Sequence, residues 1–172
     1  MTVATSKTKA PDFCNGIQHE AYGQAPAIAP SSQSISAVDD PAAVYQTLLA
    51  ADALRYLTLQ MTASKQSGHP GGFASIADTI ASLVMLGHKN LITEVGHHAP
   101  GFYSTVFIDR SLEAMGIKTV QDLCDRFRET HGLLGHLSGQ IPGLLNPAGP
   151  LGQGQHFAMA GAKLLPGTLV PV

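Results

Sequence analysis

The sequence is short of cysteine, of charged residues and of long apolar runs, and each shortage excludes a class of protein. Ten Lys and Arg stand against 12 Asp and Glu, a formal net charge of −2, so the chain lacks the basic excess that binds nucleic acid. No apolar run approaches the roughly 18–20 residues that cross a bilayer. Two cysteines, Cys14 and Cys124, make no disulfide framework. We therefore expect a cytoplasmic protein with neither a nucleic-acid nor a membrane partner.

The first 36 residues differ in composition from the rest. They show no sustained period and few large apolar residues, which predicts a disordered N-terminal arm over residues 1–36. Met1–Ala10 lacks the apolar core of a secretory signal, and the absence of Arg from the arm argues against an organelle transit peptide. Because 172 residues suit one domain, residues 37–172 are expected to form a single unit.

Most of the chain after the arm shows helical periodicity. Asp40 followed by Pro41 predicts a helix start, because Asp can accept from free N–H groups there and Pro has none to leave unpaired. Thr119 and Asp122 have capping-box-like spacing, which predicts a second start. Residues 88–98 stay ambiguous. We expect helices over 41–64, 73–86, from about 100, from 119 and over 153–165, and the start of a strand at 168–172.

The first of three distinctive loops is Ser67-Gly68-His69-Pro70-Gly71-Gly72. Its glycines let the backbone approach a ligand closely, and a histidine between them can donate to an anion or to an oxygen. A plain turn between helices with an exposed His69 would explain the same residues, and turn statistics alone favour that simpler interpretation.

The second loop is Gly96-His97-His98-Ala99-Pro100-Gly101. Two adjacent histidines before a helix start could hold an anion at the helix N-terminus. Metal binding is a weaker alternative, because adjacent residues rarely reach one ion and no Cys or carboxylate stands beside them at ligand spacing. Taken alone, such a segment is more often a surface loop.

The third loop, Gly149-Pro150-Leu151-Gly152-Gln153-Gly154, leads directly into a helix of small residues. It suits a diphosphate, because N–H groups and the positive end of the helix dipole point towards such a loop. It is neither a dinucleotide-binding glycine loop nor a P-loop, since the G-x-G-x-x-G spacing and the G-K-[ST] ending are both missing.

Taken together and in this order, the three loops resemble transketolases, a thiamine-diphosphate-dependent family. S-G-H-P-G at Ser67–Gly71 resembles the first histidine loop of the family, and Gly96-His97 followed by Tyr103-Ser104 resembles its G-H…Y-S segment. Gly135-His136, followed by Ile141-Pro142-Gly143 and by G-P-L-G-Q-G at Gly149–Gly154, resembles its third histidine and diphosphate loop. Three colinear matches are far more specific than any one of them.

The resemblance implies an α/β fold, the thiamine-diphosphate-binding fold with a parallel sheet and helices on both faces. This chain would hold a mostly helical N-terminal part of it. His69, His97 and His136 match family histidines that face the reacting end of the cofactor, its diphosphate or the donor sugar, which implies a catalytic role for each. The cofactor-binding residues implied are His97, Gly149, Pro150, Leu151 and Gly152.

The implied reaction is transfer of a two-carbon ketol unit between sugar phosphates, with thiamine diphosphate and Mg²⁺ as cofactors. The metal motif of the family, G-D-G followed by Asn, has no counterpart in the 172 residues. The catalytic Glu of the family belongs to a second domain. We therefore expect a truncated portion that is inactive alone, partners with the remaining enzyme portion or a second subunit, and forms a homodimer when complete.

Departures from the family pattern keep alternatives open. Gly135-His136-Leu137-Ser138 stands where the family usually has G-H-P-E. Pro100-Gly101 and the F-R-E-T-H-G string of the Arg126–Gly132 stretch are closer to the homodimeric pyruvate dehydrogenase component. One alternative is therefore a related enzyme that acts on a 2-oxo acid, and another is a non-catalytic remnant or interaction subunit. A histidine metal site is weaker still, because the spacing matches no common zinc pattern.

Overall fold

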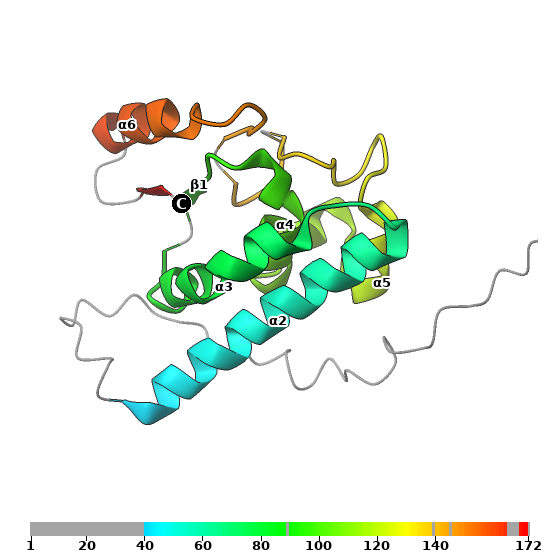
Figure 1. The fold of residues 1–172 in the computed structure, drawn as a ribbon, viewed down its shortest axis with the longest axis horizontal. Helices are drawn as coiled ribbons and strands as arrows, with labels where there is room; N and C mark the ends of the chain where they lie inside the picture. The colour runs from blue at the N-terminus through cyan, green and yellow to red at the C-terminus, as the bar shows by residue number, and fades with distance from the viewer. Residues whose placement is uncertain (1–39, 89, 139, 145, 165–168, 172) are drawn as a thin grey trace, which may run out of the picture.

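The computed structural model describes residues 40–88, 90–138, 140–144, 146–164 and 169–171, so the predicted arm over residues 1–36 lies outside the described residues. Within them, no helix is both long enough and apolar enough to span a membrane. The elements, in chain order, are α2 (Pro41–Lys65), α3 (Pro70–Met85), β1 (Asn90–Ile92), η3 (Gly96–His98), α4 (Ala99–Ile108), η4 (Ser111–Met115), α5 (Val120–Arg126), α6 (Gly154–Leu164) and β2 (Leu169–Pro171) (Figure 1).

Two of the predicted helix starts are confirmed by their caps. At the start of α2, the Asp40 carboxylate accepts from Ala42 N–H at 2.9 Å and Pro41 occupies the first turn. At the start of α5, the Thr119 hydroxyl accepts from Asp122 N–H, and the Asp122 carboxylate accepts in return from Thr119 N–H. Both caps bond atoms within three residues of one another, so the local sequence suffices to predict them.

The start of α3 was predicted three residues too late. The helix begins at Pro70 rather than Phe73, so Gly71 and Gly72 belong to its first turn. Glycine pairs are typical of loops, but here the missing side chain serves packing: a Cβ atom at Gly72 would lie 2.3 Å from His98 Nε2. Pro70 in the first turn is the local start signal, which the glycine pair after it obscured, and the contact with His98 explains why position 72 is glycine.

The core lies between α2, α3, α4 and α5. The Phe73 and Phe102 rings meet edge to face with centroids 5.7 Å apart, joining α3 to α4. Gly101 allows this contact, because a Cβ atom there would lie 1.9 Å from Phe73 Cγ. The largest fully buried side chains are Tyr103, Phe73, Phe102, Phe127, Met61, Ile80, Leu112, Ile117, Leu123 and Leu133.

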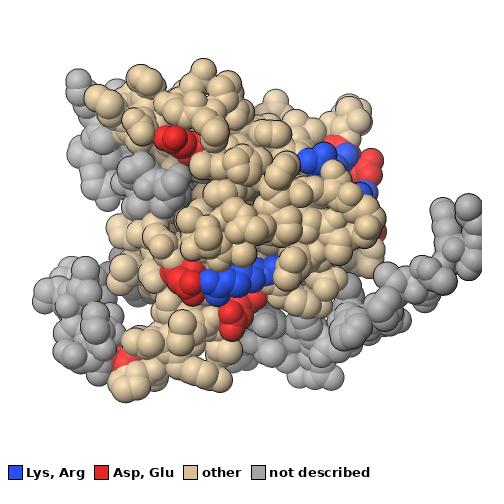
Figure 2. All heavy atoms as spheres, viewed as in Figure 1, with Lys and Arg blue, Asp and Glu red and all other residues tan. Residues whose placement is uncertain are grey.

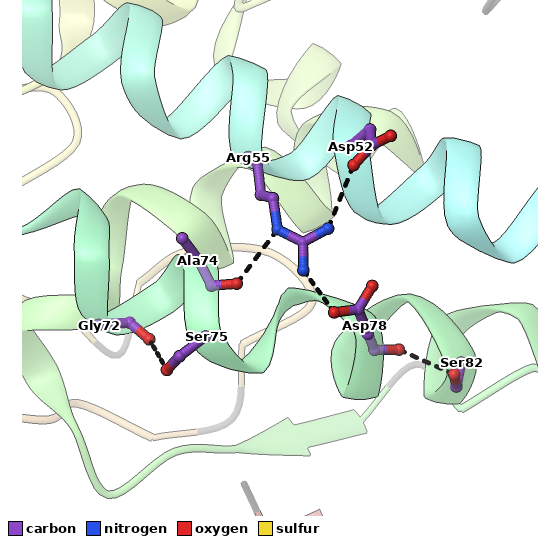
Figure 3. A network of polar contacts seen from close by, with 7 residues as sticks. All are labelled: Asp52, Arg55, Gly72, Ala74, Ser75, Asp78 and Ser82. Atoms are coloured by element: carbon purple, nitrogen blue, oxygen red, sulfur yellow. Dashed lines mark hydrogen bonds and ion pairs between the residues drawn. The ribbon is translucent and has the colours of Figure 1, made fainter.

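A polar network also ties α2 to α3 (Figure 3). From α2, the Arg55 Nε donates to the Ala74 carbonyl at 3.1 Å, and its guanidinium pairs with Asp78 of α3. A third contact joins Arg55 to Asp52 on its own helix. On the face drawn in Figure 2, Lys and Arg side chains lie beside Asp and Glu rather than in a separate basic patch.

The sheet in the described residues consists of two short parallel strands. β1 pairs with β2 in the register Asn90↔Leu169, Leu91↔Val170 and Ile92↔Pro171, and α6 lies between the strands in sequence. In Figure 1, α6 lies apart from α2, α3 and α5. The ambiguous residues 88–98 contain β1 and η3. An α/β fold with a larger parallel sheet stays a prediction, since most of what is described is helical.

Candidate functional site

The first two predicted loops meet through their histidines. His69 is the residue before the first turn of α3, and His97 belongs to η3. Their rings lie edge to face with centroids 5.3 Å apart, although 28 positions separate them in the sequence. His69 is exposed and His97 is half-buried, so both rings are within reach of a ligand.

Gly96 is the point at which the third loop reaches the second. A Cβ atom at Gly96 would lie 2.2 Å from the Ala148 carbonyl oxygen and 2.9 Å from His136 Cδ2. The backbone at Gly96 therefore packs directly on the residue before Gly149 and beside the His136 ring. The chain thus brings His69, His97 and His136 around one segment, 96–98.

The segment Gly149–Gly152, here called the candidate diphosphate loop, is exposed and fixed at both ends. Before it, Ala148 N–H donates to the Leu137 carbonyl at 3.2 Å. After it, Gly154 begins α6 so close to β1 that a Cβ atom there would lie 2.4 Å from Glu94 Cα. Gly149 and Gly152 have no neighbour within 4 Å of such an atom, and Gly152 has φ +84°. The loop is therefore anchored beside residues 94–96, with open space over its glycines.

A side-chain amide anchors the approach to this loop. Asn146 Oδ1 accepts from Thr93 N–H at 3.1 Å, and Asn146 Nδ2 donates to the Thr93 carbonyl at 2.8 Å. Both residues are buried. The amide thus continues the hydrogen-bonding pattern of β1 beyond Ile92. Sequence reasoning missed Asn146, because an isolated Asn in a Gly/Pro-rich loop is indistinguishable from a turn residue.

His98 differs from its neighbour, because its ring is buried. It contacts the His97 ring at 4.8 Å between centroids, and its Nδ1 has no hydrogen-bond partner among the described residues. Burial, with smaller contributions from His97 and His69, lowers the pKa of His98, so the ring stays neutral at neutral pH. The adjacent-histidine pattern gave no signal of this difference in burial.

Three helices begin around residues 94–98. α4 starts directly after His98, α3 starts directly after His69, which contacts His97, and α6 starts against Glu94. Free N–H groups and the positive end of the helix dipole favour anions at each start. In the described residues, no three His, Cys, Asp or Glu side chains are placed to hold a metal ion. Helix starts of this kind can receive an anion.

Comparisons of the chain with protein-family models, with curated proteins and with solved structures find no match. No family membership follows from them. The function of the site is inferred from the loop motifs and from the contacts that join the loops.

Proposed function

We propose that the chain forms part of the thiamine-diphosphate site of a transketolase-like enzyme, which transfers a two-carbon ketol unit between sugar phosphates. The observation that carries the proposal is the convergence of three motif loops on residues 94–98, with three helix N-termini around them. A diphosphate is a compact, doubly charged anion, and backbone N–H groups at helix starts are the donors that such a group needs.

The residues present fit the diphosphate end of this cofactor. The candidate diphosphate loop is exposed, and open space over Gly149 and Gly152 leaves room for the ligand to approach the backbone. His69, His97 and His136 would donate to the diphosphate or to substrate hydroxyls. The bound cofactor would supply the carbanion chemistry, while these side chains orient the substrate and stabilise charge on it.

The resemblance implies that Mg²⁺ would be held by oxygen ligands of the G-D-G motif, which is not in this sequence. The proposal therefore includes a partner, either a remaining portion of the enzyme or a second subunit, that supplies the metal ligands and the catalytic Glu. A homodimer of the complete enzyme is proposed on the resemblance alone.

Sugar phosphate is preferred to a 2-oxo acid as the substrate class. The intact G-P-L-G-Q-G string favours the sugar phosphate. Of the two pointers to a 2-oxo acid, Pro100-Gly101 and the F-R-E-T-H-G string, packing accounts for the first. Pro100 sits in the first turn of α4, where it leaves no N–H group unpaired, and Gly101 makes room for the Phe73 ring. Neither residue needs to face a substrate to explain its presence.

The test is a calorimetric titration of the full chain with thiamine diphosphate and Mg²⁺, compared with thiamine alone. We expect binding that requires the diphosphate. Replacing Gly152 with Val should weaken it about tenfold or more, because a side chain at φ +84° strains the loop and fills the space over it. Gly116→Val is the matched control, since Gly116 has φ +76° and equally open surroundings but lies in the turn after η4.

Equal losses in the two valine variants would show that backbone strain, not the ligand site, is measured. No difference between thiamine diphosphate and thiamine in the unaltered chain would contradict the proposal. Where the chain is combined with a partner that carries the G-D-G motif, turnover of a ketose phosphate and of pyruvate would then decide between the two substrate classes.

A further inference from the structure

A buried tyrosine connects the helix that follows His97 to the segment that carries His136. Tyr103, in α4, is fully buried, and its hydroxyl donates to the Leu134 carbonyl at 2.8 Å and to the His136 carbonyl at 3.2 Å. The two carbonyls flank Gly135, so one hydroxyl is hydrogen-bonded to the backbone on both sides of that glycine. Bonds shared between two acceptors in this way fix an angle as well as a distance.

A further hydrogen bond connects the residue after His136 to the start of the candidate diphosphate loop. Leu137, the next residue, accepts from Ala148 N–H at 3.2 Å, and Ala148 is the residue before Gly149. The Ala148 carbonyl and the His136 ring both pack on Gly96. The path from the tyrosine hydroxyl to the start of the loop thus contains only short backbone contacts.

The tyrosine itself is held by its surroundings. The Tyr103 and Phe127 rings meet edge to face with their centroids 6.4 Å apart. The Arg128 guanidinium lies over the Phe127 ring, 5.9 Å from its centroid. Burial raises the pKa of Tyr103 well above its ordinary value, so the hydroxyl keeps its proton and remains a donor throughout the physiological range.

From these contacts we infer that Tyr103 is a positioning residue, which sets His136 and the start of the candidate diphosphate loop at a fixed place relative to His97. The helix α4 acts as the spacer, because it begins directly after His97 and His98 and carries Tyr103. What the positioned groups bind rests on the proposed function. The positioning itself rests on the hydrogen bonds alone.

The test is Tyr103→Phe in the full chain, with Thr105→Val as the matched control. Thr105 is buried on the same helix, and its hydroxyl donates to the Gly101 carbonyl within that helix, so its loss removes a hydroxyl that does not reach His136. Circular dichroism should show both variants folded. In Tyr103→Phe, we expect the His136 ring signals to move in the NMR spectrum and the Ala148 amide to exchange roughly five- to tenfold faster, the equivalent of one hydrogen bond.

Affinity for thiamine diphosphate with Mg²⁺ provides the second readout. It should fall roughly five- to tenfold in Tyr103→Phe and stay unchanged in Thr105→Val. His136 signals and an Ala148 exchange rate that match those of the control would overturn the inference, as would unchanged affinity in a binding-competent chain. If the unaltered chain binds no thiamine diphosphate, the proposed function fails, while the His136 and Ala148 readouts still decide the role of Tyr103.

The unaltered chain offers a measurement that does not depend on the folding of a variant. A hydroxyl proton held between two carbonyls exchanges slowly with water and gives through-space cross-peaks to the protons of residues 134–136. Observing both for Tyr103 would support the inference. A hydroxyl that exchanges at the rate of an exposed tyrosine would overturn it.

Discussion

Two regions of this molecule are held together in different ways. The helical base, α2 to α5, is stabilised by large interlocking side chains such as Phe73 and Phe102. The loop junction, residues 94–98, 134–137 and 146–154, is held by backbone-to-backbone approach at Gly96 and Gly154 and by single polar groups. We therefore expect the base to set the stability of the molecule and the junction to set the relative positions of the candidate ligand groups.

The largest expected effect on stability lies in the base. Replacing Phe73 with Ala removes a fully buried ring from between α3 and α4 and leaves a cavity beside Gly101. We expect the free energy of unfolding to fall by about 3–5 kcal/mol, measured by urea denaturation. A loss below about 1 kcal/mol would mean that the neighbouring side chains fill the cavity. It would contradict the claim that the packing of the base sets the stability of the molecule.

The junction should show the opposite balance. Replacing Gly96 with Ala places a methyl group against the Ala148 carbonyl and the His136 ring, so these groups must separate. We expect a smaller loss of stability, about 1–3 kcal/mol, together with a loss of thiamine-diphosphate affinity of roughly tenfold or more.

The matched control for this change is Gly71→Ala. Gly71 lies in the first turn of α3, close to His69, and has no neighbour within 4 Å of an added Cβ atom. Stability and affinity should both be retained there. Equal affinity losses at the two glycines would show that any change near the histidines disturbs binding. The claim that the contacts at Gly96 position the candidate ligand groups would then be wrong.

The smallest effect concerns a cap at the edge of the base. Asp122→Ala breaks the capping box of α5 and should lower the free energy of unfolding by about 1 kcal/mol at neutral pH. Hydrogen bonds from Lys118 N–H, and then from Thr119, lower the pKa of Asp122 in the folded chain below its ordinary 3.8. The stabilisation is therefore present above that value and is lost as the pH falls through the lower folded pKa.

The measurement is urea denaturation of both chains at pH 7 and at about pH 2.5. The difference between the unaltered chain and Asp122→Ala should shrink at the lower pH, because the protonated carboxyl accepts hydrogen bonds less well. A difference that is independent of pH would show that the lost stability comes from helix propensity rather than from the carboxylate.

Some parts of the fold could be predicted because their causes are local. The caps at Asp40 and Thr119 act on N–H groups two or three residues away, so the sequence around them contains everything that is needed. The limits of α2 and α6 came within one or two residues for the same reason. The three loops were also found by sequence, because each places several glycines, with histidine in the first two, in an unusual short pattern.

Other parts depend on residues that are far apart in the chain. The close approach of α3 to His98 requires Gly72, the Tyr103 hydroxyl bonds to the His136 carbonyl, and Gly96 and Asn146 contact the residues around the candidate diphosphate loop. No pattern in the neighbouring sequence encodes these contacts. The local sequence was therefore enough to predict the main helices, two of their caps and the composition of the loops. How those loops meet follows from the folded chain alone, because their positions depend on hydrogen bonds and steric contacts between residues far apart in the sequence.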